Sequence, residues 1–142
     1  MTHARDPRID SLASIEVLSG LSDRQLAALC RLTTQVVIRE GQLLCKQGAA
    51  AREVFLLLDG AVAVSCDGRP ASVVRSGGTI GEMGILNRQR RTANDIALSD
   101  VTALVMNAAE FEQLQSLLPV VAARLRELGL RRAEELQLLQ SA

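Results

Sequence analysis

Short apolar runs, separated by glycines and aspartates, fill the middle of the chain. The runs are Val36–Ile38, Gln42–Leu44, Val54–Leu58, Ala61–Cys66, Ala71–Val74, Ala93–Leu98 and Val101–Met106. Asp59-Gly60 and Asp67-Gly68 stand between such runs, and Asp-Gly in that position is a strong signal for a β-hairpin. The pattern therefore predicts several short strands in an antiparallel sandwich or barrel.

Helical patterns flank this β-rich body. Residues 1–10 are expected to form a flexible tail, and a short helix is expected over Ile9–Leu18. Ser22 and Gln25 have the spacing of a capping box. This box predicts a helix that runs to about Leu32.

Two more helices are predicted after the last strand. Asn107 can cap a helix that ends near Leu118, and Pro119 suits the first turn of another. The second helix, which ends near Leu139, carries a stripe at helical spacing: Val121 or Ala122, Leu125, Leu128, Arg132, Leu136 and Leu139. Packing of this stripe against the body of the domain is the favoured interpretation. A dimer seam or a lid over a ligand is the alternative, which the charged Arg132 slightly favours.

The length and composition predict a single domain with an aliphatic core. The chain has 142 residues, 48% of them apolar, enough for one hydrophobic core. We expect one domain over residues 11–142, with the β-rich body over about 35–107 and the C-terminal helices over about 108–140. Phe55 and Phe111 are the only aromatic residues, so the core is expected to be aliphatic.

Charge and cysteine content exclude several functional classes. Sixteen basic and sixteen acidic side chains balance, so bulk charge does not attract the chain to nucleic acid or anionic membranes. Cys30, Cys45 and Cys66 are far apart and fit reduced thiols, and no signal peptide or bilayer-spanning run is visible. These features predict a cytoplasmic protein, or a cytoplasmic regulatory domain of a membrane protein.

Groups for catalysis or metal binding are sparse. His3 is the only histidine, and the cysteines lack metal-ligand spacing, so no metal site is expected. No histidine base or G-x-S-x-G elbow supports nucleophilic catalysis. We therefore expect no enzyme and no catalytic residue.

The stretch from Gly77 to Ala93, GGTIGEMGILNRQRRTA, concentrates groups that can bind a phosphate. Its glycines permit close approach of the backbone, and backbone N–H groups together with the Arg91 guanidinium suit a phosphate. Glu82 would repel a phosphate and needs another partner, such as a sugar hydroxyl. The stretch lacks the G-K-[ST] of a Walker loop and the spacing of a Rossmann fingerprint. It therefore indicates a nucleotide bound in a different way.

These residues match a known family. The run Gly81-Glu-Met-Gly-Ile-Leu86, followed by Arg91-Thr-Ala93, resembles the phosphate-binding cassette of cyclic nucleotide-binding domains. Gly41–Gly48 and Val54–Gly60 are similar to strands of that family, and the resemblance covers about Leu12 to Arg132. It implies a mainly β fold with flanking helices. The expected body is an eight-stranded antiparallel β-roll, jelly-roll-like, with an N-terminal helix and two C-terminal helices.

The resemblance also implies a role for each cassette residue. Arg91 would pair with the exocyclic phosphate, with backbone N–H groups around Gly84 and Ile85 adding hydrogen bonds. Glu82 and the Gly81 backbone would bind the ribose 2′-OH. The implied ligand-binding set is Gly81, Glu82, Met83, Gly84, Ile85, Arg91, Thr92 and Ala93. Leu128 and Arg132 are the lid residues implied in the last helix.

Two positions depart from the family pattern. Arg90 stands where the family often has proline, next to the cassette arginine. Asn94 and Asp95 stand where the family has apolar strand residues. An outward-facing pair or a β-bulge is expected to accommodate them.

The resemblance predicts a cyclic nucleotide sensor. The ligand is expected to be cAMP, with cGMP open, and the output to be closure of the last helix over the base. Its partners would be an effector outside this chain and a second copy bound through the C-terminal helix. No direct nucleic-acid partner is expected, since no winged helix follows. The rival prediction is a ligand-free fold used for interaction or dimerisation. A cupin-type metalloenzyme would need histidines that the sequence lacks.

Overall fold

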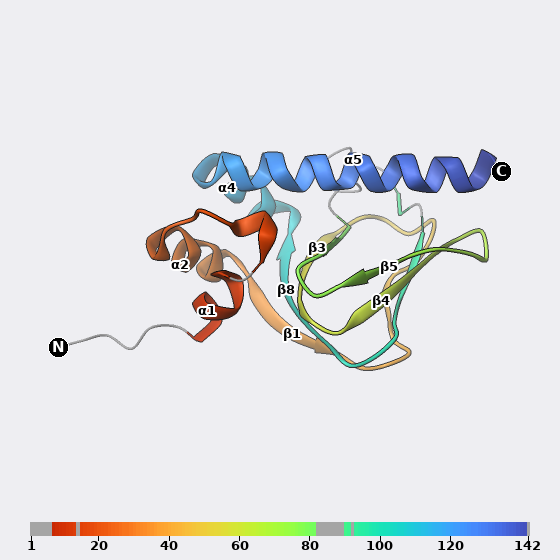
Figure 1. The fold of residues 1–142 in the computed structure, drawn as a ribbon, viewed down its shortest axis with the longest axis horizontal. Coiled ribbons are helices and arrows are strands. Elements are labelled where there is room, and N and C mark those ends of the chain that lie inside the picture. The colour runs from red at the N-terminus through yellow and green to blue at the C-terminus, as the bar shows by residue number, and fades with distance from the viewer. Residues whose placement is uncertain (1–6, 14, 82–89, 92, 142) are drawn as a thin grey trace.

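A two-sheet β-roll with helices at one end forms the body of the molecule (Figure 1). The computed structural model describes residues 7–13, 15–81, 90, 91 and 93–141. In this part of the chain, eight strands run antiparallel: β1 (Thr34–Ile38), β2 (Leu43–Cys45), β3 (Glu53–Asp59), β4 (Ala61–Cys66), β5 (Arg69–Arg75), β6 (Thr79–Ile80), β7 (Asn94–Ala97) and β8 (Val101–Asn107). The predicted β-roll is thereby confirmed. The apolar runs identify every strand except the two-residue β6, which lies inside the glycine-rich stretch.

The two sheets differ in what covers them. The first sheet has the strand order β1-β8-β3-β6 and the second has the order β2-β7-β4-β5. Along β3, Phe55 and Leu57 face the second sheet, whereas Val54 and Leu56 face the helices. Burial on both faces explains the unbroken apolar run of this strand. In β4, buried residues alternate with partly exposed ones because its other face meets solvent.

The helices pack on the outer face of the first sheet. They are α1 (Pro7–Ala13), the 3-10 helix η1 (Glu16–Leu18), α2 (Asp23–Leu32), α4 (Ala108–Leu117) and α5 (Pro119–Ser141). Ser22 and Gln25 form the predicted capping box, and Asn107 forms a second one with Glu110. The expected helix over Ile9–Leu18 is divided between α1 and η1. Helix α1 begins at Pro7, so residues 7–10 are helical where a tail was expected.

Helix α5 is the longest element and runs across the top of the roll (Figure 1). It contacts α4, η1 and β5. Val121 and Leu125 are buried in the helical cluster, as packing against the body predicts. Arg124 donates two hydrogen bonds from Nη1, to the carbonyl oxygens of Val17 at 3.0 Å and Ser19 at 2.8 Å. The beginning of α5 is therefore tied to the N-terminal helices.

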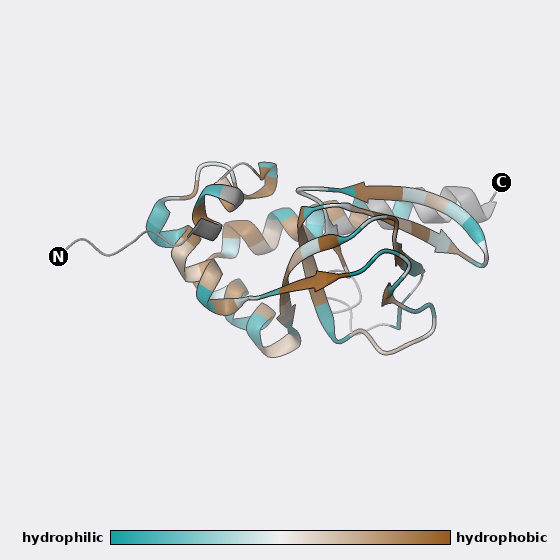
Figure 2. Cartoon of the chain, turned by 90° about the horizontal axis from the view of Figure 1, so that it is seen from below, coloured by the Kyte–Doolittle hydropathy of each residue, from teal (hydrophilic) through white to brown (hydrophobic). Residues whose placement is uncertain are grey.

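The two Asp-Gly pairs have different roles. Asp67 and Gly68 both adopt positive φ, 53° and 76°, in the two-residue turn of the β4–β5 hairpin. The hairpin expected at Asp59-Gly60 is wrong, because β3 and β4 belong to different sheets. The turn at Gly60 carries the chain from the first sheet to the second. Figure 2 shows the hydrophobic residues along the strands and hydrophilic residues at the turns.

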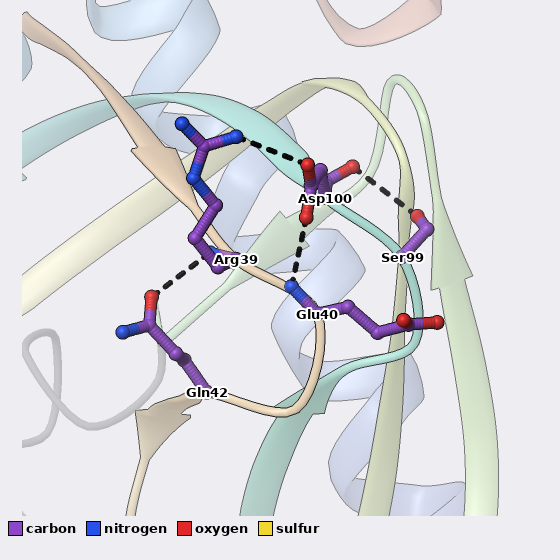
Figure 3. Close-up of polar contacts among 5 residues, drawn as sticks. All are labelled: Arg39, Glu40, Gln42, Ser99 and Asp100. Atoms are coloured by element: carbon purple, nitrogen blue, oxygen red, sulfur yellow. Dashed lines mark hydrogen bonds and ion pairs between the residues drawn. The ribbon is translucent and has the colours of Figure 1, made fainter.

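A polar cluster at the far end of the roll joins two turns (Figure 3). The Asp100 carboxylate accepts hydrogen bonds from the Glu40 backbone N–H at 3.0 Å and from Arg39 Nη1 at 3.1 Å. The Gln42 side chain accepts from the Arg39 backbone N–H at 2.8 Å. The first two contacts hold the pKa of the Asp100 carboxyl below its usual range. The cluster connects the β1–β2 turn to the β7–β8 turn.

Candidate functional site

Arg91 is held between the two sheets by both its backbone and its side chain. Its backbone N–H donates to the Ala49 carbonyl at 2.8 Å, and the Gly48 N–H donates to the Arg91 carbonyl at 2.9 Å. Its guanidinium donates to Gly81 O at 2.8 Å and to Glu53 O at 2.6 Å. Gly81 follows β6 and Glu53 begins β3, so the side chain reaches across to the first sheet.

The Arg91 guanidinium has more N–H donors than its two carbonyl partners use. Among residues 7–13, 15–81, 90, 91 and 93–141, no carboxylate lies within ion-pair distance of the guanidinium. Two backbone carbonyls orient the group but carry no net charge. A guanidinium has five N–H donors, so further donors remain for a phosphate oxygen. The arrangement suits a bound anion.

Gly81 is the residue that makes room for this guanidinium. It has a φ of +90°, and a Cβ built on it would collide with Arg91 Nη1 and lie 2.7 Å from Glu53 O. Any larger residue would therefore strain the backbone and displace the arginine. This is a structural reason for the glycine at the first position of the predicted cassette.

Several predicted ligand-binding residues lie outside the described residues: Glu82, Met83, Gly84, Ile85 and Thr92. Gly81, Arg91 and Ala93 are described, and the structure brings Gly81 and Arg91 into direct contact. Ala93 is buried between the sheets with an exposed fraction of 7%. The predicted lid residue Leu128 is half-buried and packs against the helical cluster. Arg132 lies in α5, but its side chain is outside the description.

Arg90 is exposed and supports the same loop as Arg91. Its Nη1 donates to the Gly48 carbonyl at 3.0 Å, and Arg90 pairs with Ala50 in an isolated β-bridge. At the position where proline is frequent in the family, the Arg90 side chain thus stabilises the backbone that leads into Arg91.

Gln47 braces the loop that holds Arg91, and no motif in the sequence identifies it. Its side-chain amide donates to Asp67 Oδ1 at 2.6 Å and accepts from the Asp67 backbone N–H at 2.9 Å. Its own backbone N–H donates to Asn94 Oδ1 at 2.8 Å. Gln47 therefore links the hairpin tip, the beginning of β7 and the loop that contains Gly48. These partners are distant in sequence, so local patterns carry no signal for them.

The Asn94-Asp95 pair lies where the pairing of β2 with β7 is irregular, which agrees with a β-bulge, one of the two predicted arrangements. The register between β2 and β7 shifts between Leu43 and Cys45. The outward-facing pair is wrong, because Asp95 is buried with an exposed fraction of 7%. Only Asn94 faces away from the interior, and it accepts the Gln47 hydrogen bond.

The interior face of the second sheet carries a thiol beside an acid. Cys45 is the cross-strand neighbour of Asp95, and both residues are buried. Burial, followed by the negative charge of Asp95, raises the pKa of the Cys45 thiol to about 12, whereas Arg91 acts in the opposite direction. The thiol is therefore protonated at neutral pH and is a poor nucleophile.

The described residues match neither the pattern of a metal site nor that of a membrane-spanning helix. No group of three His, Cys, Asp or Glu side chains in this part of the chain could hold a metal ion. No helix there is long and apolar enough to cross a bilayer.

Comparisons with known proteins bear on the family and the fold of the chain. The profile of the cyclic nucleotide-binding domain matches residues 35–116. A cyclic nucleotide-gated potassium channel of Rhizobium etli is 25% identical over 121 residues, which cover 85% of this chain and 34% of that protein. The cGMP-dependent protein kinase, isozyme 1, of Drosophila melanogaster is 30% identical over 114 residues, or 75% of this chain and 15% of the kinase. The chain thus spans about a third or less of the length of these relatives.

A solved structure shares the fold. The catabolite activator protein of Thermus thermophilus superposes with a TM-score of 0.75 at 24% identity, over 88% of this chain and 61% of that one. At this level of identity the likeness concerns the fold alone. The residues that bind a ligand have to be argued from this chain itself.

Proposed function

Because the chain belongs to the cyclic nucleotide-binding domain family, we propose that it binds a 3′,5′-cyclic purine nucleotide, either cAMP or cGMP. The domain is a regulatory type of fold and not a catalytic one. Binding would control an effector that lies outside these residues, in a cytoplasmic setting.

The position of Arg91 is the observation that carries this proposal. Its guanidinium is held by Gly81 O and Glu53 O, and it has no carboxylate partner among the residues described. A cyclic phosphate carries one negative charge, which one guanidinium can neutralise. A guanidinium oriented in this way would bind a monoanion with little rearrangement.

The remaining cassette residues complete the proposed site. Glu82, together with the Gly81 backbone, would accept the ribose 2′-OH. Backbone N–H groups from Met83 to Ile85 would add to the phosphate contacts. Thr92 and Ala93 would lie beside the phosphate and the base.

Helix α5 is the proposed output element. Arg124 and the buried Leu125 attach its first turns to the N-terminal helices, whereas its later turns extend along the roll (Figure 1). Leu128 and Arg132 would close over the base, shifting the population toward a closed state. Through α5 the domain would act on its effector or on a second copy of the chain.

Isothermal titration calorimetry with cAMP, cGMP and 5′-AMP tests the proposal. The wild-type chain is expected to bind a cyclic nucleotide and to discriminate against 5′-AMP, whose phosphate carries a second charge. Arg91→Ala should weaken binding at least tenfold, because a charged hydrogen bond contributes about 1.5–3 kcal/mol. Arg31→Ala, at an exposed position of α2, removes the same charge elsewhere and should leave the affinity unchanged.

Two results would contradict the proposal. A wild-type chain that binds neither cyclic nucleotide would reject the proposal in favour of a ligand-free interaction domain. Equal affinities of the Arg91→Ala and Arg31→Ala variants would show that the ligand binds elsewhere.

A further inference from the structure

The tip of the β4–β5 hairpin is hydrogen-bonded to the loop that holds Arg91. Residues 46–52 form this loop, which joins β2 to β3 and crosses from the second sheet to the first. Gln47 lies in the loop, and Asp67 lies at the hairpin tip. Gln47 Nε2 donates to Asp67 Oδ1 at 2.6 Å, and Gln47 Oε1 accepts from the Asp67 N–H at 2.9 Å. Two hydrogen bonds in one pair fix the orientation of its members as well as their distance.

The same loop holds Arg91 at two points. Near the beginning of the loop, the Gly48 N–H donates to the Arg91 carbonyl at 2.9 Å, and the Ala49 carbonyl accepts from the Arg91 N–H at 2.8 Å. Where the loop enters β3, Glu53 O accepts from Arg91 Nη2 at 2.6 Å. Gln47 directly precedes the residues that bond the Arg91 backbone. A displacement of Gln47 therefore moves the backbone from which the guanidinium extends.

The hairpin turn gives Asp67 a conformation that suits this contact. Asp67 has a φ of 53°, in the left-handed region that is uncommon for residues other than glycine. This φ is the one that a two-residue hairpin turn requires, and in it both the N–H and the carboxylate of Asp67 contact Gln47. The turn thus presents a donor and an acceptor together. A primary amide matches both, because it carries one acceptor oxygen and an NH₂ donor.

We propose that Gln47 and Asp67 are positioning residues for nucleotide binding, which fix the Arg91 guanidinium where it meets the phosphate. This inference rests on the proposed function. Neither residue has to touch the ligand. The hairpin tip and the phosphate site are then energetically coupled, and such coupling is reciprocal. Loss of the Gln47–Asp67 bonds weakens nucleotide binding, and bound nucleotide strengthens those bonds.

An exchange of the amide and the carboxylate tests the pair. Gln47→Glu brings two carboxylates together and should weaken binding of cAMP or cGMP about two- to tenfold, as expected for lost hydrogen bonds. Asp67→Asn alone keeps an acceptor for Gln47 Nε2 and should bind as the wild type does. In the double variant the amide at position 67 donates to the carboxylate at position 47, so the wild-type affinity should return. Isothermal titration calorimetry of the full chain measures all four proteins.

Gln42→Glu is the matched control. Gln42 also accepts a hydrogen bond from a backbone N–H, that of Arg39 at 2.8 Å, but it does so at the far end of the roll. The same added charge there should leave the affinity unchanged. If charge alone acted on the phosphate, Asp67→Asn would bind more tightly than the wild type, and the two effects would add in the double variant. That result, or unchanged affinity in a folded Gln47→Glu variant, would overturn the inference.

Residue-resolved hydrogen exchange of the wild type decides the matter if a variant fails to fold. Saturation with cAMP or cGMP, whichever binds more tightly, should slow exchange of the Asp67 N–H by about two- to tenfold, the same factor that reciprocity demands. The Glu40 N–H also donates to a side chain in an exposed turn and should keep its rate. An Asp67 N–H that responds no more than the Glu40 N–H overturns the coupling while the proposed function stands. A wild type that binds neither nucleotide overturns the proposed function, and this inference with it.

Discussion

At the scale of single residues, the contact between Gly81 and Arg91 depends on the missing side chain at position 81. The glycine has a φ of +90°, and the Arg91 guanidinium occupies the space that a Cβ would take. Asp95 shows the same dependence on surroundings, since its burial comes from the register of three strands. In both cases the role of the residue depends on residues that are close in space but distant in sequence.

Gly81→Ala is expected to lower both stability and nucleotide affinity. The positive φ costs about 1 kcal/mol for alanine, and the new methyl group displaces Arg91 from the Gly81 and Glu53 carbonyls. Urea unfolding and calorimetry with cyclic nucleotide measure the two effects.

Gly41→Ala is the control for backbone strain. Gly41 has a similar φ of +86°, but a Cβ there meets nothing within 4 Å. It should lose comparable stability from the strained φ and keep its affinity. If Gly81→Ala kept its affinity too, the contact with Arg91 would have no part in binding.

At the scale of elements, hydrogen bonds at the ends of helices and strands fix where helices begin and how the turns between strands are held. Capping boxes at Ser22 and Asn107 open α2 and α4, and both helices begin one residue later. Asp100 joins two turns of the roll through Glu40 and Arg39. Such contacts are local in space, but only the caps are also local in sequence.

Asp100→Asn is expected to reduce stability in a manner that depends on pH. The Glu40 N–H and the Arg39 guanidinium lower the pKa of Asp100 in the folded state. The stabilisation is therefore present above its ordinary pKa of 3.8 and is lost as the pH falls through the lower, folded value.

Melting temperatures of the wild type and Asp100→Asn between pH 7 and pH 3 provide the measurement. The difference between the two proteins should be constant near neutrality and shrink at the acidic end. Asp59→Asn, which lies outside this cluster, serves as the control. A difference that does not change with pH would mean that the charge of Asp100 contributes nothing.

At the scale of the whole molecule, α5 joins parts of the chain that are far apart in sequence. Its first turns are buried among the helices, and Arg124 reaches the Val17 and Ser19 carbonyls. The helix then passes β5, as Figure 1 shows. A movement of α5 must therefore either break these contacts or bend the helix beyond them.

Arg124→Ala is expected to loosen α5 without unfolding the roll. Two hydrogen bonds from a half-buried cation are lost, for which about 1–3 kcal/mol is reasonable. Hydrogen exchange should become at least tenfold faster in α5 and stay unchanged in β3 and β8. Arg126→Ala, at an exposed position of the same helix, should show wild-type exchange. Identical exchange in the two variants would show that the Arg124 hydrogen bonds do not hold α5 in place.

The sequence by itself determined the features that depend on nearby residues. Strand periods, the Asp67-Gly68 turn and the capping box at Ser22 follow from neighbours within a few positions. The cassette pattern, with Gly81 and Arg91, named the family and the candidate phosphate site.

The tertiary structure alone decided which strands share a sheet and which groups meet inside the roll. Asp59-Gly60 resembles a hairpin turn locally, but β3 pairs with β8 and leaves β4 to the other sheet. Likewise, Gln47, Cys45 and Asp95 obtain their partners from positions about twenty to fifty residues away in the chain. Side-chain burial and contacts between distant segments arise from the packing of the sheets, and no local pattern encodes them.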